Sequence, residues 1–275
     1  TLVAVNILNA VSGALDNTIR FYDQAAPDGS THQDLTQLVS DLNAGKIKLL
    51  IIDDSNPVYA LPHSMGFLKA MKKAFVVSLA SQKSETTHAA NLVLPTLTAY
   101  ESWGDAFPRA GVRSIQQPVM STVNTFDAKA REDILLNAAQ SANEKAFPRN
   151  SNYLDYLQDV WSKIQIEVGD ERNFDSFWIN VLENGGIFEQ PKYIRTSLNR
   201  KVTSVKVNDP GMADRDGLTL LPTTSLLLGD GSGANKPWLQ EVPNPMSQIV
   251  WDSWMEINPE TAQNLGINDR AIIEV

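Results

Sequence analysis

Histidines and paired carboxylates are the residues of this chain whose chemistry could support catalysis. His32, His63 and His88 lie far apart and in no metal-ligand spacing, so we expect surface or capping roles for them. Glu101 and Asp105 lie four residues apart and could form a carboxylate pair. Because no base or nucleophile lies near them in sequence, we expect a solvated face or a helix cap instead. The sequence therefore predicts no catalytic and no metal-binding residues.

Two polar stretches have some features of binding loops. Residues 229–233 read Gly-Asp-Gly-Ser-Gly after an apolar run, as a phosphate loop would, but no helix pattern follows and the Asp would repel phosphate. Residues 209–217 are acidic but lack the alternating carboxylates and closing Glu of a calcium loop. We expect both stretches to be turns.

Composition limits the function classes that the chain can have. The 275 residues carry a formal net charge of −9, which opposes nucleic acid or an anionic membrane as the main partner. With no cysteine, the chain can hold neither a disulfide nor a cysteine-ligated iron–sulfur cluster. No apolar run reaches the roughly 20 residues that span a bilayer, so we expect no direct membrane insertion. The chain begins without Met and ends in a strand-like pattern, from which we expect a piece of a larger protein.

Apolar runs and helical spacing predict an α/β fold class. Ile47 to Ile52 and Phe75 to Leu79 are uninterrupted apolar runs, typical of buried parallel strands, and residues 92–94 would extend the sheet. A helix capped by Ser64, with Phe67, Leu68 and Met71 facing inward, should connect the first two strands. Further helices are expected at residues 2–14, 31–44, 153–164, 174–182 and 260–265, and β-like runs at 201–207, 218–221, 225–228 and 271–275. Loops at the carboxyl ends of parallel strands commonly bind ligands, which directs attention to residues 53–57.

The order of several loops resembles a known family. Residues 51–57, 85–95 and 101–104 look like the third, dinucleotide-binding domain of molybdopterin-dependent oxidoreductases, and residues 255–267 resemble the opening of that family's C-terminal barrel. Within the family, residues 100–105 and 235–245 are most similar to the large iron–sulfur subunit of alternative complex III, a bacterial quinol-oxidising respiratory complex. The resemblance implies a Rossmann-like domain at 1–140, a helical then irregular or β connecting region at 141–247, and the start of a barrel-like domain at 248–275.

The resemblance also assigns candidate cofactor-binding positions. These are Ser55, Asn56, Pro57, Glu85, Thr86, Glu101 and Gly104. Departures from the family pattern occur in three loops. Asp54 replaces a small residue, Ala80 replaces an Asp that binds guanine, and Asp105 replaces a Thr. A carboxylate beside a pyrophosphate is electrostatically unfavourable. We therefore expect these positions to be vestigial and the molybdenum cofactor to be absent.

Resemblance implies the following setting for the whole protein. The chain would be a structural part of a quinol-oxidising electron-transfer subunit that carries its iron–sulfur clusters elsewhere in the full-length polypeptide. Its partners would be other subunits of the respiratory complex and the remainder of its own polypeptide, at the periplasmic face of the bacterial inner membrane. Two alternatives remain. The chain could be the nucleotide-binding part of an active bis-molybdopterin guanine dinucleotide oxidoreductase, or an α/β ligand- or peptide-binding module.

Trp238, Trp251 and Trp254 lie in a proline-marked, turn-rich stretch. Aromatic side chains supply large apolar area and are enriched at protein interfaces. These tryptophans could seal a domain boundary of the chain itself, or could face a partner or the remainder of the polypeptide. Their solvent exposure distinguishes the two interpretations.

Overall fold

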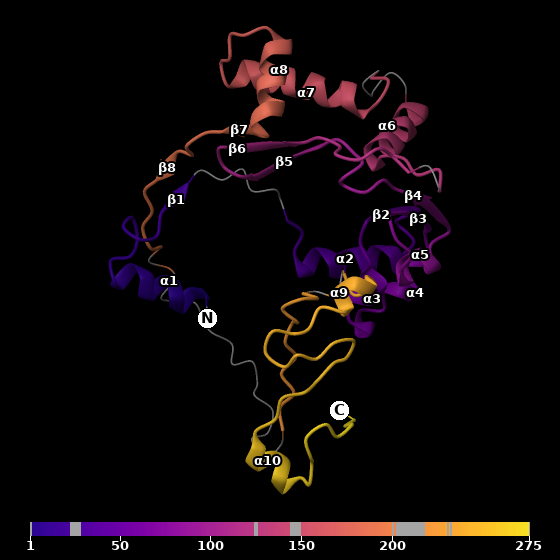
Figure 1. The fold of residues 1–275 in the computed structure, drawn as a ribbon, viewed down its shortest axis with the longest axis vertical. Helices are drawn as coiled ribbons and strands as arrows, with labels where there is room; N and C mark the ends of the chain where they lie inside the picture. The colour runs from indigo at the N-terminus through magenta and orange to yellow at the C-terminus, as the bar shows by residue number, and fades with distance from the viewer. Residues whose placement is uncertain are drawn as a thin grey trace. The chain divides into compact units, whose positions relative to one another are not determined.

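The chain folds into short helices and three small sheets (Figure 1). The structure is a computed structural model, and it describes residues 2–22, 29–123, 126–143, 150–199, 201, 218–229, 231 and 233–274. The mixture of a parallel sheet with antiparallel sheets confirms the predicted α/β class. The predicted turn at 209–217 lies outside the described residues, as do residues 230 and 232 of the glycine-rich stretch.

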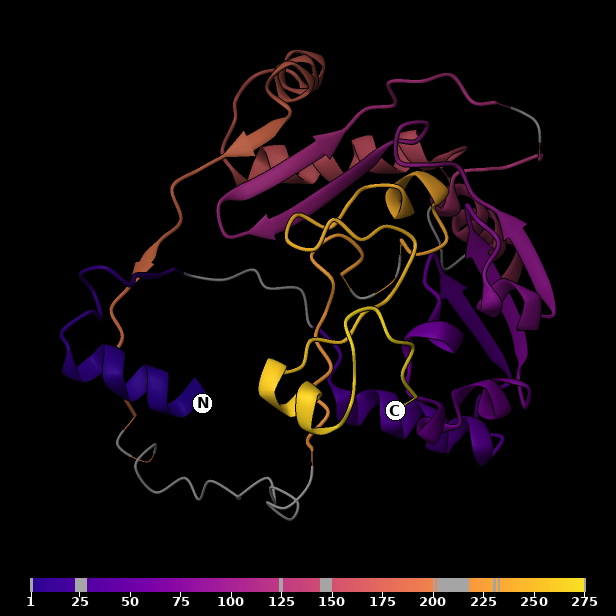
Figure 2. The same ribbon diagram turned by 60° about the horizontal axis from the view of Figure 1, so that its bottom comes forward.

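A three-stranded parallel sheet forms where the two apolar runs predicted it. Strands β2 (Leu49–Asp53), β3 (Phe75–Ala80) and β4 (Leu92–Pro95) lie in that order, side by side in Figure 2. Leu50 pairs with Val76, and Ser78 pairs with Val93, both in parallel register. The prediction of adjacent parallel strands is therefore confirmed, and the polar loops after β2 and β3 lie at the carboxyl edge of one sheet.

Four short helices and a 3₁₀ turn surround this sheet. They are α2 (His32–Asn43), α3 (Pro57–Ala60), η1 (His63–Met65), α4 (Phe67–Met71) and α5 (Glu85–Ala89). Helix α2 begins as predicted at Thr31, whose side chain and that of Asp34 form a capping box. The predicted cap at Ser64 is wrong because Ser64 lies inside η1, and Leu68 is exposed rather than inward-facing. Phe67 and Met71 are buried as predicted, in a core that also contains Leu42, Ala70 and Val76.

An antiparallel sheet and two helices form a second core. Strands β5 (Gly104–Arg109), β6 (Val112–Gln116) and β7 (Gly186–Phe188) lie in that order, with α7 (Tyr153–Glu167) and α8 (Phe174–Asn184) on one face (Figure 1). Both helices follow the predicted spacing, and Asn152 and Asn173 cap their first turns. Trp161 is completely buried among Ile115, Phe177 and Val181. The β5–β6 hairpin, in contrast, was not predicted.

The N-terminal segment forms its own small pairing within the first compact unit. Helix α1 (Leu2–Val11) is followed by β1 (Phe21–Tyr22), which pairs antiparallel with β8 (Tyr193–Ile194). Helix α6 (Arg131–Ala142) leads toward α7. No helix in the described ranges is long and apolar enough to span a membrane.

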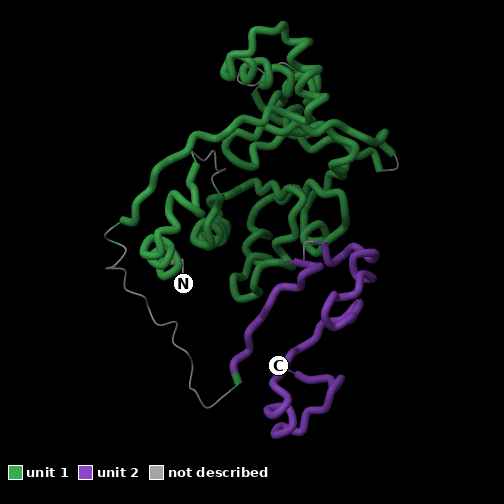
Figure 3. Tube along the Cα trace, turned by 60° about the vertical axis from the view of Figure 1, so that its left-hand side comes forward, with its two compact units in different colours: residues 1–218 green, residues 219–275 purple. Residues whose placement is uncertain are grey.

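The chain divides into two compact units, Thr1–Leu218 and Thr219–Val275 (Figure 3). The second unit contains α9 (Pro237–Gln240) and α10 (Pro259–Asn264), the latter where a helix was predicted. The β-like runs at 218–221, 225–228 and 271–275 do not form strands over their described residues, and the Ser225–Gly229 bridge is isolated. No strand from the described part of this unit joins a sheet, and it contains no closed barrel. The run at 201–207 is described only at Lys201, and the three-part division at 140 and 248 stays a prediction.

Candidate functional site

Asn56 links the loops that follow β2 and β3. It directly precedes α3, and Pro57 is the first residue of that helix. The Oδ1 atom of Asn56 accepts hydrogen bonds from the Thr86 backbone N–H at 3.1 Å and the Thr86 hydroxyl at 2.8 Å. Its amide nitrogen donates to Oε2 of Glu85 at 2.7 Å. Three predicted site residues thus meet at the carboxyl edge of the sheet, where Asn56 ties the turn after β2 to the first residues of α5.

Asn56, Glu85 and Thr86 form a cluster in which Asn56 is hydrogen-bonded to both of the other residues. Thr86 is fully buried, and its hydroxyl oxygen also accepts a hydrogen bond from the Val58 N–H at 3.2 Å. The hydrogen bond from Asn56 lowers the pKa of Glu85 below its usual value. Ser55 is exposed, and no side-chain hydrogen bond of it is recorded in the described part of the chain. The polar groups that would contact a nucleotide instead join α3 to α5.

Carboxylates dominate the tip of β2. Asp54 has a φ of 39°, in the left-handed region that favours glycine, and its N–H donates to the Leu79 carbonyl at 2.8 Å. Asp54 therefore has a side chain where a glycine would adopt the same backbone conformation without strain. Asp53 pairs with Arg131, at the start of α6, with 3.1 Å between Oδ2 and Nη1. Arg131 also pairs with Glu132 at 3.2 Å, so this cation already has two carboxylate partners. Sequence patterns gave no indication of this role for Arg131.

Glu101 and Gly104 belong to a separate loop. The Oε2 atom of Glu101 accepts hydrogen bonds from the Thr98 N–H and hydroxyl, and Oε1 accepts one from the Val123 N–H at 3.1 Å. These bonds, first of all the one from the Thr98 backbone, lower the pKa of Glu101. Gly104 is the first residue of β5. Over the described residues, no recorded hydrogen bond or ion pair joins this loop to the Asn56 cluster. The structure therefore brings only part of the predicted site together.

Asp105 has neither of the expected surface roles. It lies on β5, and its Oδ2 accepts a hydrogen bond from Nε1 of buried Trp161 at 3.1 Å. Burial raises the pKa of Asp105 above its usual value. For Asp105 the expectation of a solvated face or helix cap is wrong, because residues 104–109 form a strand and the Asp105 carboxylate bonds to Trp161 of α7.

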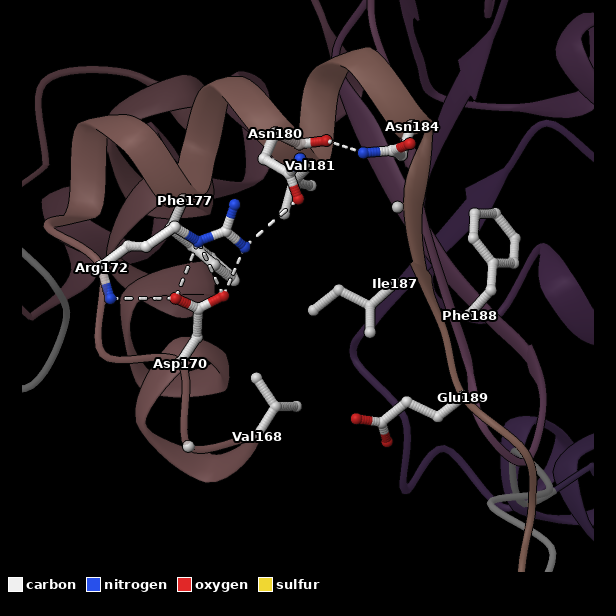
Figure 4. Close-up of a pocket in the computed structure, with 12 residues that line it drawn as sticks. Val168, Asp170, Arg172, Phe177, Asn180, Val181, Asn184, Ile187, Phe188 and Glu189 are labelled. Carbon is white, nitrogen blue, oxygen red and sulfur yellow. Dashed lines mark hydrogen bonds and ion pairs between the residues drawn. The ribbon is translucent and has the colours of Figure 1, made fainter.

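A surface cavity of about 520 Å³ lies between β7, α8 and the loop after α7 (Figure 4). Val168, Ile187 and Glu189 border the opening, and Arg172 is held by Asp170 and by a 3.2 Å hydrogen bond to Asn180. None of the predicted site residues lines it. Among the described residues, no group of three or more His, Cys, Asp or Glu side chains is arranged to hold a metal ion.

Comparison with known proteins gives one partial match. A stretch of 112 residues, 38% of this chain, is 34% identical to the menaquinone reductase, molybdopterin-binding-like subunit of Nitratidesulfovibrio vulgaris. This match supports a relationship to the molybdopterin oxidoreductases. The aligned stretch covers only 16% of that subunit. No family model matches the chain.

The three tryptophans of the second unit are solvent-exposed. Trp238, Trp251 and Trp254 expose 85%, 58% and 39% of their surface. Trp251 also has a φ of 60°, a strained conformation for a bulky residue. The second unit by itself therefore does not bury these tryptophans, and their role at a domain boundary or at a partner interface stays a prediction.

Proposed function

We propose that this chain is a structural part of a molybdopterin-oxidoreductase-like subunit of a quinol-linked electron-transfer complex. In this proposal the domain keeps the family's sheet and loop order but binds no molybdenum cofactor. The subunit resembles that of alternative complex III, with its iron–sulfur clusters elsewhere in the polypeptide. Other subunits would cover it at the periplasmic side of the membrane. The partial match to a menaquinone reductase subunit supports the respiratory setting.

One observation carries the proposal: the candidate cofactor-contacting groups are bonded to one another. Asn56, Glu85 and Thr86 form a closed cluster, and a nucleotide would have to break its bonds to reach them. A pyrophosphate at the tip of β2 would also meet the carboxylates of Asp53 and Asp54, and the adjacent Arg131 is already paired. These groups do not fit a dianionic dinucleotide. Its phosphates need positively charged partners, whereas this edge presents negatively charged carboxylates.

A working nucleotide site is the second candidate. It is favoured by the convergence of the Asn56 and Glu85 loops at one carboxyl edge, where α/β sheets commonly bind ligands. The two candidates differ in what they predict for free nucleotide.

We expect GDP, used as the probe for the guanine nucleotide half of the cofactor, not to bind the chain in calorimetric titration. The double variant Asp54→Gly/Asp53→Asn removes the two carboxylates. It is the control that shows whether their charge alone prevents GDP from binding. Binding of GDP to the unmodified chain with a dissociation constant of roughly 1 μM, about −8 kcal/mol, and its loss in Asn56→Ala would establish the active-site alternative.

A further inference from the structure

The antiparallel sheet has one unprotected edge. Its strand order over the described residues is β5-β6-β7, so β5 and β7 are the two edge strands. The pairing of β5 is irregular between Ala106 and Arg109, and Pro108 lies within this irregularity. Bulges and prolines of this kind prevent an edge strand from pairing with a further strand. Strand β7 has neither a proline nor a bulge, and its last residue, Phe188, exposes 62% of its surface.

Backbone groups of β7 are directed away from β6. The Glu189 N–H donates to the Gly111 carbonyl at 2.7 Å. Hydrogen-bonded pairs alternate with non-bonded pairs along an antiparallel ladder, so Ile187 is the next bonded position. Gly186 and Phe188 are therefore at non-bonded positions opposite β6, and their N–H and C=O groups face the open side. Among the residues that the structure describes, no recorded hydrogen bond joins these groups to a loop or to another element.

The surface cavity of Figure 4 adjoins this edge, because all three residues of β7 line it. Figure 4 shows the side chains of Ile187 and Glu189 directed toward the cavity, with Val168 and Asp170 on the opposite side. Side chains of a strand alternate between the two faces of a sheet. A strand added beside β7 would therefore direct every second side chain toward α8 and into this cavity.

The surroundings of the cavity are negatively charged, and one carboxylate has no close partner. Every lining residue comes from the stretch 168–189, which contains five Asp or Glu residues and one basic residue, Arg172. Arg172 is paired with Asp170. Glu189 makes no recorded hydrogen bond or ion pair within the described ranges. The guanidinium with which it interacts at longer range, that of Arg113, is bonded to both carboxylate oxygens of Glu167. The chemical complement of this surface is a cationic side chain.

We propose that an extended, basic segment of a partner protein docks on the open edge of β7 as a fourth strand. Its backbone bonds to the N–H and C=O groups of Gly186 and Phe188. A Lys or Arg on its α8-facing side places its methylene groups against Val168 and Ile187 and its charge beside Glu189. A second copy of this chain does not suit the edge, because its own β7 would bring another Glu189 carboxylate to the same place.

This docking site does not rest on the proposed function. Its test needs only the chain and a synthetic peptide, without a quinol, a cluster or a cofactor. Failure of the peptide to bind would leave the proposed function standing, and molybdenum in the full-length protein would leave the docking site standing.

The probe is a fluorescein-labelled peptide of seven residues that alternates Lys and Val, and its fluorescence anisotropy is measured during titration with the chain. We expect saturable binding, and no binding of a peptide that alternates Glu and Val. An added strand bonds to β7 through every second residue only. N-methylation of one alternate set of amides should therefore abolish binding, whereas N-methylation of the other set should leave it unchanged. No binding of the Lys peptide, or equal effects of the two methylated sets, would overturn the proposal.

A matched pair of substitutions tests the charge. Glu189→Gln should weaken binding about threefold, as expected for an exposed ion pair. Glu183→Gln changes an exposed carboxylate of α8 that does not line the cavity, so it should leave the affinity unchanged. Equal effects of the two substitutions would contradict the docking site.

Amide hydrogen exchange locates the bound peptide. The Gly186 and Phe188 amides should exchange freely in the chain alone and become protected when the Lys peptide binds. Binding that leaves both amides unprotected would overturn the proposal. Protection that instead rises with the concentration of the chain alone would identify a second copy as the occupant, and would also overturn it.

Discussion

Replacing Asn56 by Ala is expected to lower the free energy of unfolding by about 2 kcal/mol, because fully buried Thr86 loses the acceptor of its N–H and hydroxyl. Chemical denaturation measures this change. The effect should also depend on pH. The bond to Asn56 lowers the folded-state pKa of Glu85, so it stabilises the fold above the unfolded-state pKa and loses this effect as pH falls through the folded-state value. The difference between the two proteins should therefore shrink in acid.

Two controls accompany this substitution. Ser55→Ala changes the exposed neighbouring residue and should stay within about 0.5 kcal/mol of the parent. Asn56→Asp keeps an acceptor for Thr86 but places a second carboxylate against Glu85, so its destabilisation should increase as pH rises. If Asn56→Ala and Ser55→Ala were equally stable, the cluster would not be a structural element.

Replacing Gly186 by Ala should be among the most damaging single changes, at about 3 kcal/mol, the upper end of the usual cost of overpacking. Gly186 begins β7 with a φ of 139°, and an added Cβ would lie 2.8 Å from the Ser114 Cα and against the Arg113 carbonyl. Because these are backbone atoms of β6, strand β7 would have to move away. Thermal or chemical unfolding measures the loss.

The adjacent glycine provides a matched control. Gly185 has a φ of 73° at the end of α8, but an added Cβ meets nothing within 4 Å. Its replacement by Ala should cost only the left-handed backbone strain, about 1 kcal/mol. Equal losses for the two variants would show that backbone strain, not contact between β6 and β7, makes Gly186 necessary.

Local patterns in the sequence predict much of this fold. Apolar runs predicted β2, β3 and β4, and helical spacing predicted α2 and α7, because these signals lie within a few residues of one another. The β5–β6 hairpin was missed because its pairing lies between segments without a strong alternating pattern. Leu68 was misplaced because the buried face of α4 consists of Phe67, Ala70 and Met71, and small Ala70 gives a weak hydrophobic signal in the sequence.

The candidate site was predictable only in part. The resemblance assigned Asn56, Glu85 and Thr86 to one candidate site, although Asn56 lies about 30 residues from the other two in sequence. It could not show that these side chains bond to one another. The pairing of Asp53 with Arg131 spans 78 residues and follows no local spacing, so sequence patterns contain no signal for it.

The metal content of the full-length protein tests the central claim most directly. Purified protein would be analysed for molybdenum and tungsten by mass spectrometry, and for pterin by the fluorescence of its oxidation product, with iron measured in the same sample. We predict iron from clusters elsewhere in the polypeptide, but molybdenum, tungsten and pterin far below one equivalent per chain. Stoichiometric molybdenum or tungsten together with pterin would contradict the account.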